Sequence, residues 1–294
     1  MRIGQFHDGG ASTWMGVARS DGTVVNLPVA GAAAGVELPA RTRELFEEWA
    51  WRRKVELAVD HAVETGTGLV DAESVSRGPP VAEPRKVVCV GLNYRDHAEE
   101  GDNPIPDEPV LFSKFPTSVN GPGGTIAWDQ DLTETVDYEA ELVAVIGSEA
   151  REVEVDEAEE YVAGYTVGND VSARDIQHGD GQWVRGKSLD TFAPIGPDVV
   201  TPDEVGDVED LGIWTEVNGE RLQDSSTGEL IFGIDELVSF CSRAFTLQPG
   251  DLLFTGTPPG VGVYREPPVL LEDGDTVTVG IEGIGELTNG CRYR

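Results

Sequence analysis

The spacing of short apolar segments is the feature that most constrains how this chain can fold. After residue 85, segments of five to nine residues alternate with clusters of Gly, Pro, Asn and Asp; their sequences are VVCVGLN, PVLFSKF, ELVAVIG, YVAGYTVGN, IWTEVNG, DLLFTGT, TVTVGIEG and GELTN. Segments of this length between such clusters are typical of β-strands, and the best candidate for a helix is 236–245. Many short strands with few helices favour a β-sandwich or roll over a doubly wound parallel sheet.

The beginning of the chain has a more mixed pattern. Segments 2–6 and 14–27 alternate apolar and polar residues, and Ser20-Asp21-Gly22 interrupts the second segment with a sequence typical of a hairpin turn. A cluster of Ala and Gly at 30–35 indicates a loop.

A helical pattern follows this cluster. Residues 40–64 carry apolar side chains at roughly helical spacing with charges between them, which predicts one long helix. Prolines at 79–84 then mark a boundary. The sequence therefore predicts a small α/β N-terminal domain over 1–80 and a mainly β domain with some helix over 81–294.

The charge of the chain excludes some classes of partner. Asp and Glu number 54 against 21 Lys and Arg, which gives a net charge of −33. Such a surface repels nucleic acid and anionic lipid, so neither is expected as a partner. The acidic residues are scattered among apolar-periodic segments, which indicates a folded domain with an acidic surface rather than acidic disorder.

The kind of positive charge is as unusual as its amount. Only four lysines occur, at 54, 86, 114 and 187. In both respects the composition resembles that of proteins from halophilic archaea. Molar salt shortens the Debye length to about 3 Å and so screens the self-repulsion of an acidic surface.

The sequence also bears on where the protein works. The start, MRIGQFHD, lacks a basic segment followed by an apolar stretch, and no apolar run approaches the roughly 18 residues of a membrane span. We therefore expect a cytoplasmic protein. Three cysteines, far apart and in no C-x-x-C spacing, argue against a disulfide framework and against a thiolate zinc site, so we expect them to be small apolar fillers.

Two carboxylates stand where a buried strand begins. In DYEAELVAVIG, Glu139 and Glu141 are two residues apart and would project from the same face of a strand. Paired like charges on a buried face call for a neutralising cation. In so acidic a chain, however, roughly ten pairs at this spacing are expected by chance, and the pair alone can equally be a solvated one.

A third carboxylate follows a separate strand. Residues 161–167 predict a strand that ends near Asp170, which could complete a site with Glu139 and Glu141. Three carboxylates select a hard ion, Mg²⁺ or Mn²⁺ before Ca²⁺, and disfavour zinc. The sequence therefore predicts a divalent metal site with coordination positions left for substrate.

A histidine supplies a candidate base. His97 lies after a predicted buried strand, in GLNYRDHAEE, which can form a helical turn that brings Glu100 beside it. A histidine polarised by a carboxylate is a competent general base near neutral pH. A solvated turn with an incidental histidine is the competing interpretation.

One further motif points to a nucleotide. Residues 181–188, GQWVRGKS, satisfy the phosphate-loop pattern G-x-x-x-x-G-K-[ST]. No apolar strand precedes Gly181, and Pro194 and Gly196 would soon stop a following helix. The context therefore argues against a nucleotide-binding switch or ATPase.

Six stretches in order resemble the fumarylacetoacetate hydrolase family, and the resemblance covers about 84–289. They are CVGLNYRDHAEE, DYEAELVAVIG, GYTVGNDVSARDIQ, RGKSLDTFAPIGP, VNGERLQDSSTGELIF and LQPGDLLFTGTPPGVG. The resemblance implies a mainly β fold with α, a mixed β-sandwich roll, and a homodimer. The first eighty residues are only loosely similar to the N-terminal domain of the family.

Carried over by position, the resemblance assigns roles to particular residues. It implies that Glu139, Glu141 and Asp170 bind the metal and that His97 and Glu100 form a catalytic dyad on a lid that closes over the substrate. The remaining matched positions line or lie near the active site, with Lys187 stabilising an oxyanion; they are Tyr94, Lys114, Arg174, Gln177, Lys187 and Thr257. Lys114 is followed by Phe115, where many members have proline, so its match departs from the family pattern.

The resemblance implies a divalent-metal-dependent hydrolase that cleaves a carbon–carbon bond in a small 2,4-dioxo acid, such as an acylpyruvate, to a 2-oxo acid and a carboxylic acid. Alternatives on the same metal site are an oxaloacetate decarboxylase, a dehydratase of 2-oxo-3-deoxy sugar acids, and a hydratase or isomerase of aromatic-degradation intermediates. The pair of His97 and Glu100 favours hydrolysis, because water needs a base. A non-catalytic binding protein is disfavoured because every catalytic-type residue is present.

Overall fold

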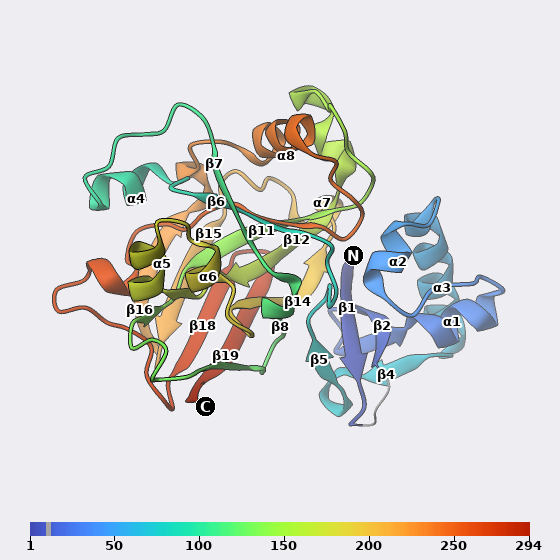
Figure 1. The fold of residues 1–294 in the computed structure, drawn as a ribbon. Coiled ribbons are helices and arrows are strands. Elements are labelled where there is room, and N and C mark those ends of the chain that lie inside the picture. The colour runs from blue at the N-terminus through green and yellow to red at the C-terminus, as the bar shows by residue number, and fades with distance from the viewer. Residues whose placement is uncertain (10–12) are drawn as a thin grey trace.

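A twelve-stranded mixed sheet runs through the whole fold (Figure 1). The computed structural model describes residues 1–9 and 13–294. In spatial order the main strands of this sheet are β4 (Leu69–Asp71), β3 (Thr23–Asn26), β2 (Thr13–Ala18), β1 (Arg2–His7), β14 (Ala193–Val200), β12 (Val162–Asn169), β11 (Ala140–Ile146), β17 (Leu252–Phe254), β6 (Val87–Gly91) and β7 (Val110–Lys114). Two short strands join it at the side, β5 (Ser76–Gly78) on β1 and β8 (Val119–Asn120) on β14.

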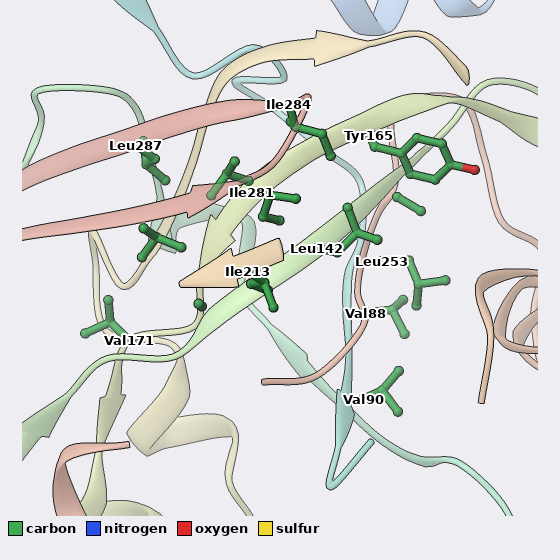
Figure 2. Close-up of a cluster of buried hydrophobic side chains, with 14 of the residues drawn as sticks. Val88, Val90, Leu142, Tyr165, Val171, Ile213, Leu253, Ile281, Ile284 and Leu287 are labelled. Atoms are coloured by element: carbon green, nitrogen blue, oxygen red, sulfur yellow. The ribbon is translucent and has the colours of Figure 1, made fainter. Parts of the chain in front are cut away.

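A second sheet of five strands packs on the large one and closes the sandwich. Its order is β16 (Glu220–Ser226), β15 (Gly212–Val217), β18 (Thr276–Ile281), β19 (Gly285–Tyr293) and β9 (Thr125–Trp128). Aliphatic side chains from both sheets interdigitate between them, among them Leu142 and Leu253 from one sheet and Ile213, Ile281 and Leu287 from the other (Figure 2). The predicted class, mainly β with α and a β-sandwich core, is confirmed.

The N-terminal strands form one end of the large sheet and carry helices beside them, drawn in blue in Figure 1. The predicted hairpin is confirmed, because β2 and β3 pair on either side of the turn at Gly22. The helices are α1 (Leu27–Ala34), α2 (Thr42–Phe46) and α3 (Trp51–Thr65). The boundary predicted near residue 80 stays a prediction, since β1 pairs with β14 and the sheet runs on across it.

Two expectations for this region are wrong. The Ala- and Gly-rich cluster is not a loop: it lies in α1, where the Asn26 side chain accepts a hydrogen bond from the Val29 N–H, and Gly35 ends the helix at φ 72°. The helix predicted over 40–64 is two helices, α2 and α3. Ala50 adopts φ 57° before Trp51, a left-handed conformation that interrupts helical hydrogen bonding.

The remaining helices lie in the sandwich part of the chain. They are α4 (Arg95–Glu100), α5 (Arg174–Asp180), α6 (Val184–Lys187), α7 (Pro202–Val205) and α8 (Ile234–Ala244), with 3-10 turns at Ala72–Ser74, Pro116–Ser118, Val155–Tyr161, Thr227–Glu229 and Gly262–Tyr264. The helix predicted over 236–245 is confirmed by α8. A two-stranded pair of β10 (Val136–Asp137) and β13 (Ser172–Ala173) completes the fold.

The structure also bears on the cysteines and on membrane-spanning helices. The three cysteines are free and buried, as predicted. Within residues 1–9 and 13–294, no helix is long and apolar enough to cross a bilayer.

Candidate active site

The register between two central strands brings the three predicted metal ligands together. Glu141 is the second residue of β11, and Glu139 precedes that strand on the same face. At the end of β12, the Asn169 side chain accepts a hydrogen bond from the Glu139 N–H at 3.0 Å, and the Asp170 N–H donates to the Glu139 carbonyl at 2.9 Å. Asp170 is therefore fixed beside the start of β11.

These three carboxylates form one buried cluster. Each offers an oxygen within 4.8 Å of the others, and Glu139, Glu141 and Asp170 are 6%, 1% and 0% exposed. Burial, followed by repulsion from Asp170 and Glu139, raises the pKa of the Glu141 carboxyl well above its usual range. The competing interpretation of a solvated acidic pair is therefore wrong, and the cluster carries unfavourable charge that a cation would offset.

Three buried cations already hold part of the cluster. Lys187 Nζ donates to Glu139 Oε2 at 2.7 Å and to Asp170 Oδ2 at 2.9 Å, and Arg174 pairs with Glu139 Oε1 at 2.6 Å. Lys114 pairs with Asp170 and donates to the Val171 carbonyl at 2.9 Å. Burial opposes ionisation of Glu139, but Lys187 and Arg174 outweigh it and lower the pKa of that carboxyl to about 2.

Glu141 differs from its two neighbours. Over the described residues it has no cationic partner within ion-pair distance, and its Oε2 accepts a hydrogen bond from the Gly256 N–H at 2.7 Å. Counting Asp137 as well, four buried carboxylates face three buried cations. A divalent ion bound by carboxylate oxygens alone fits both the donor set and the remaining negative charge.

Asp137 is a buried carboxylate beside the candidate site that the sequence analysis missed. It is completely buried and accepts hydrogen bonds from Arg174 Nε at 2.8 Å and from the backbone N–H groups of Gly262 at 2.7 Å and Val263 at 3.1 Å. Pairing of β10 with β13 sets Asp137 next to Arg174. Its position two residues before Glu139 in DYEAE was the available signal, because the same alternation directs it toward the site.

The predicted contact between His97 and Glu100 is present. On α4, His97 Nδ1 lies 2.9 Å from Glu100 Oε2, and Glu100 Oε1 accepts a hydrogen bond from the Gly260 N–H at 2.8 Å. The His97 ring also lies against Tyr264, with centroids 5.9 Å apart. The helix is thereby attached to the loop that follows β17, and the interpretation of a merely solvated turn does not fit these contacts.

A cavity of about 230 Å³ joins the dyad to the carboxylates. Seven of the predicted site residues line it: His97, Glu139, Glu141, Arg174, Gln177, Lys187 and Thr257. Asp170 and Glu100 do not line the cavity but bind residues that do. The same cavity is thus lined by His97 and by two of the three clustered carboxylates.

Two predicted substrate-binding residues do not line this cavity. Lys114, at the end of β7, is 2% exposed and lies behind Asp170. Tyr94 is completely buried, and burial together with the charge of Glu141 raises the pKa of its hydroxyl well above the usual range. Within the described part of the chain that hydroxyl has no hydrogen-bond partner.

The residues of the phosphate-loop motif do not form a nucleotide-binding loop in this fold. Helix α5 leads into Gly181, where a nucleotide-binding loop would follow a strand. The motif lysine, Lys187, is committed to Glu139 and Asp170. The structure therefore agrees with the sequence argument against nucleotide binding at this motif.

Comparison with known proteins points to the same family as the sequence motifs. The family model described as fumarylacetoacetate (FAA) hydrolase C-terminal matches residues 86–292. A relative named oxaloacetate tautomerase fahd2, mitochondrial, from Xenopus laevis is 39% identical over 293 residues, which cover 98% of this chain and 89% of the relative.

Solved structures match over the whole chain. The fumarylacetoacetate hydrolase of Exiguobacterium antarcticum superposes with a TM-score of 0.82 at 35% identity, covering 100% of both chains. The 5-carboxymethyl-2-hydroxymuconate delta-isomerase of Mycobacterium smegmatis has a TM-score of 0.78 at 35% identity, covering 100% of this chain and 99% of its own. Sequence motifs, family model and fold agree, and this chain belongs to the fumarylacetoacetate hydrolase family of enzymes.

Proposed function

We propose that this protein interconverts the enol and keto forms of a small 2-oxo dicarboxylic acid, with oxaloacetate as the leading candidate. The observation that carries the proposal is a histidine, held by Glu100, that faces the same small cavity as Glu139 and Glu141. The relative that matches 98% of this chain is named for oxaloacetate tautomerisation. A reaction that only moves a proton requires a base and a means to stabilise an enolate, and the site offers groups for both.

The three carboxylates supply the second requirement. Glu139, Glu141 and Asp170 would hold Mg²⁺, or alternatively Mn²⁺ or Ca²⁺, and the bound ion would act as a Lewis acid on the 2-oxo group. Lys187 and Arg174, which bind Glu139, keep that ligand ionised and aimed into the cavity. With a divalent ion present, the charge of the buried groups changes from net negative to net positive, which suits an anionic substrate.

His97 and its neighbours supply the proton transfer. Glu100 accepts at Nδ1, so the proton of neutral His97 lies there and Nε2 is free to act as a base. His97 Nε2 takes a proton from C3 of the keto acid and returns it to the 2-oxygen, or moves it in the opposite direction. Gln177 accepts a hydrogen bond from Arg174 at its Oε1, 3.1 Å away, which leaves its amide N–H groups to bind a substrate carboxylate.

The size of the cavity favours a compact substrate. At about 230 Å³ it lies below the roughly 300–1,000 Å³ of pockets for drug-sized ligands. A four-carbon dicarboxylic acid fits this space more readily than one with a bulky distal group.

Hydrolysis of an acylpyruvate is the second candidate, because the same His97–Glu100 pair can activate water. In that reaction His97 would deprotonate a water that attacks the distal carbonyl, and the bond between C3 and C4 would break to give pyruvate and a carboxylic acid. Decarboxylation of oxaloacetate, dehydration of deoxy sugar acids and isomerisation of aromatic-degradation intermediates need the same enolate but no activated water.

One assay panel separates these reactions. The enzyme, with Mg²⁺ or Mn²⁺ and at high KCl, is given enol-oxaloacetate, keto-oxaloacetate, acylpyruvates and a 2-oxo-3-deoxy sugar acid, and proton NMR follows the products. We expect His97-dependent loss of the enol signal without pyruvate formation. Faster release of pyruvate from an acylpyruvate would replace the proposal with hydrolysis, and pyruvate from oxaloacetate would replace it with decarboxylation.

Three expectations stay predictions beside this proposal. A homodimer is tested by light scattering of the purified protein, and a halophilic character by unfolding midpoints from low to molar KCl. A cytoplasmic location is tested by fractionation of source cells.

A further inference from the structure

Gln223 is a buried polar residue outside the predicted site that connects two parts of it. It lies on β16, is completely buried and does not line the cavity. Its Oε1 accepts hydrogen bonds from the Ala140 N–H at 2.9 Å and from Thr215 Oγ1 at 2.7 Å. Its Nε2 donates to Thr257 Oγ1 at 2.9 Å and to the Pro258 carbonyl at 2.8 Å.

Two of these partners fix which way the amide points. The Ala140 N–H can only donate and the Pro258 carbonyl can only accept. A rotated amide would set N–H groups against the Ala140 N–H and oxygen against the Pro258 oxygen, so only the observed orientation satisfies both backbone groups. In this orientation Gln223 accepts the hydrogen bond from Thr215 and donates the one to Thr257.

The consequence falls on Thr257. Because Gln223 donates to Thr257 Oγ1, that oxygen is an acceptor toward Gln223, and its own proton must point elsewhere. Thr257 is 5% exposed and lines the cavity together with His97 and Glu141. Over residues 1–9 and 13–294, its hydroxyl donates to no protein group.

We propose that Gln223 is a positioning residue that sets the Thr257 hydroxyl as a hydrogen-bond donor toward an anionic oxygen of the substrate. The inference rests on the proposed function only for the class of ligand, a small 2-oxo acid anion. The inference gives the Thr257 hydroxyl one hydrogen-bonding role, that of a donor. It would bind carboxylate or enolate oxygens and would disfavour ligands that present a hydrogen-bond donor at that point.

The same amide connects this donor to the metal-binding strand. Ala140, whose N–H binds Gln223, stands between Glu139 and Glu141. All four hydrogen-bonding positions of the amide are used, so rotation of Gln223 would cost several buried hydrogen bonds at once. The distance between the carboxylate ligands and the donor is thereby held fixed before substrate binds.

Oxalate binding tests the donor without requiring turnover. Oxalate is a planar dianion that resembles the enolate of a 2-oxo acid, and its affinity in saturating Mg²⁺ is measured by calorimetry for wild-type protein, Thr257→Val and Thr257→Ser. We expect about 10- to 100-fold weaker binding for Thr257→Val, the size of a lost hydrogen bond to a charged group, and a change of less than about threefold for Thr257→Ser. Thr166→Val is the matched control, because Thr166 is buried on β12 with an unpartnered hydroxyl, and it should bind oxalate like wild-type protein.

A double-mutant cycle tests Gln223 itself. Gln223→Met keeps the side-chain length and removes the amide, and its effect on oxalate affinity is measured first in wild-type protein and then in the Thr257→Val variant. Positioning through Thr257 predicts a clear loss in the first background and little further loss in the second. A purely structural role predicts equal losses in both, and thermal unfolding curves report any general damage.

The outcomes separate this inference from the proposed function. Unchanged oxalate affinity in Thr257→Val, equal losses in the two backgrounds, or absence of oxalate binding by wild-type protein in Mg²⁺ would each overturn the inference. Thr257-dependent binding by an enzyme that does not convert oxaloacetate would retire the proposed function and leave the inference in place.

Discussion

The two sides of the cavity are built in different ways. On the acidic side, Glu139 and Glu141 line the cavity and Asp170 lies beside them; all three lie where two central strands pair and are at most 6% exposed. The second side is α4, a helix of six residues in which the His97 and Glu100 side chains are 14% and 23% exposed. The acidic side is part of the core, whereas the base side is attached to the surface of the fold.

The contacts that hold each side indicate which side is able to move. The acidic cluster is held by three buried cations and by the ladder between β11 and β12. Helix α4 is held through three hydrogen bonds to other segments: Arg95 Nη1 donates to the Leu230 carbonyl, Ser225 Oγ donates to Asp96 at 2.5 Å, and the Gly260 N–H donates to Glu100. We infer that the acidic side is preformed and that substrate exchange occurs by partial release of α4, which costs few hydrogen bonds.

The largest effect is expected at the acidic side. Glu141→Gln removes the ligand that no buried cation neutralises, so metal binding should be lost and turnover should fall by at least about a thousandfold. Calorimetric titration with Mg²⁺ and the oxaloacetate assay measure these effects. Glu149→Ala, an exposed position beyond the same strand, is the control and should change neither.

Stability separates loss of a ligand from loss of fold in this variant. A neutral amide relieves the repulsion among the three carboxylates, so the metal-free variant should melt no lower than metal-free wild-type protein. Full activity without metal in Glu141→Gln would contradict the assignment of the acidic side as a metal site.

The next effect is expected on α4. His97→Ala should lower turnover by about two to four orders of magnitude, because the base is lost, while Mg²⁺ affinity stays near the wild-type value. The comparison of the two sides predicts this separation of activity from metal binding. If metal affinity fell together with turnover, the two sides would not be independent and the comparison would fail.

This contrast also explains what the sequence alone could predict. Strand alternation placed Glu139 and Glu141 on one face and suggested that Asp170 could join them, and the register of β11 and β12 does bring the three together. The spacing of His97 and Glu100 predicted a contact within one helical turn, and it exists. Local periodicity therefore made both groups of side chains candidates and predicted the β-sandwich class, whereas their expected roles came from the family resemblance.

The sequence could not predict contacts between segments that are distant along the chain. Gln223 binds Thr257 and Ala140, 34 and 83 positions away, and no periodic pattern marks such a side chain. Lys114 was expected near the substrate, but the direction in which β7 leaves its side chain places it behind Asp170. The Ala- and Gly-rich composition suggested a loop, but this segment forms α1, which is capped by Asn26 and ends at Gly35.

A smaller effect is expected from the partner of the base. Glu100→Gln keeps the length of the side chain but removes the charge that faces His97 Nδ1. A charge-assisted hydrogen bond is about twice as strong as a neutral one, so turnover should fall by about 10- to 100-fold, less than in His97→Ala. Steady-state kinetics measure it, and Glu99→Gln, at the exposed neighbouring position, is the control.

The smallest effect is expected at the attachment of α4. Ser225→Ala removes the hydrogen bond to Asp96 without touching the cavity. Loss of one partly buried hydrogen bond, about 1 kcal/mol, should shift α4 toward release and raise KM by at most about fivefold with little change in kcat. Faster hydrogen exchange confined to 95–100 would accompany this shift, and Ser148→Ala, at an exposed position, should leave both unchanged. Because the acidic side is preformed, Mg²⁺ affinity should not respond; a fall in it would mean that α4 also helps to hold the carboxylates, and the two sides would then form one cooperative unit.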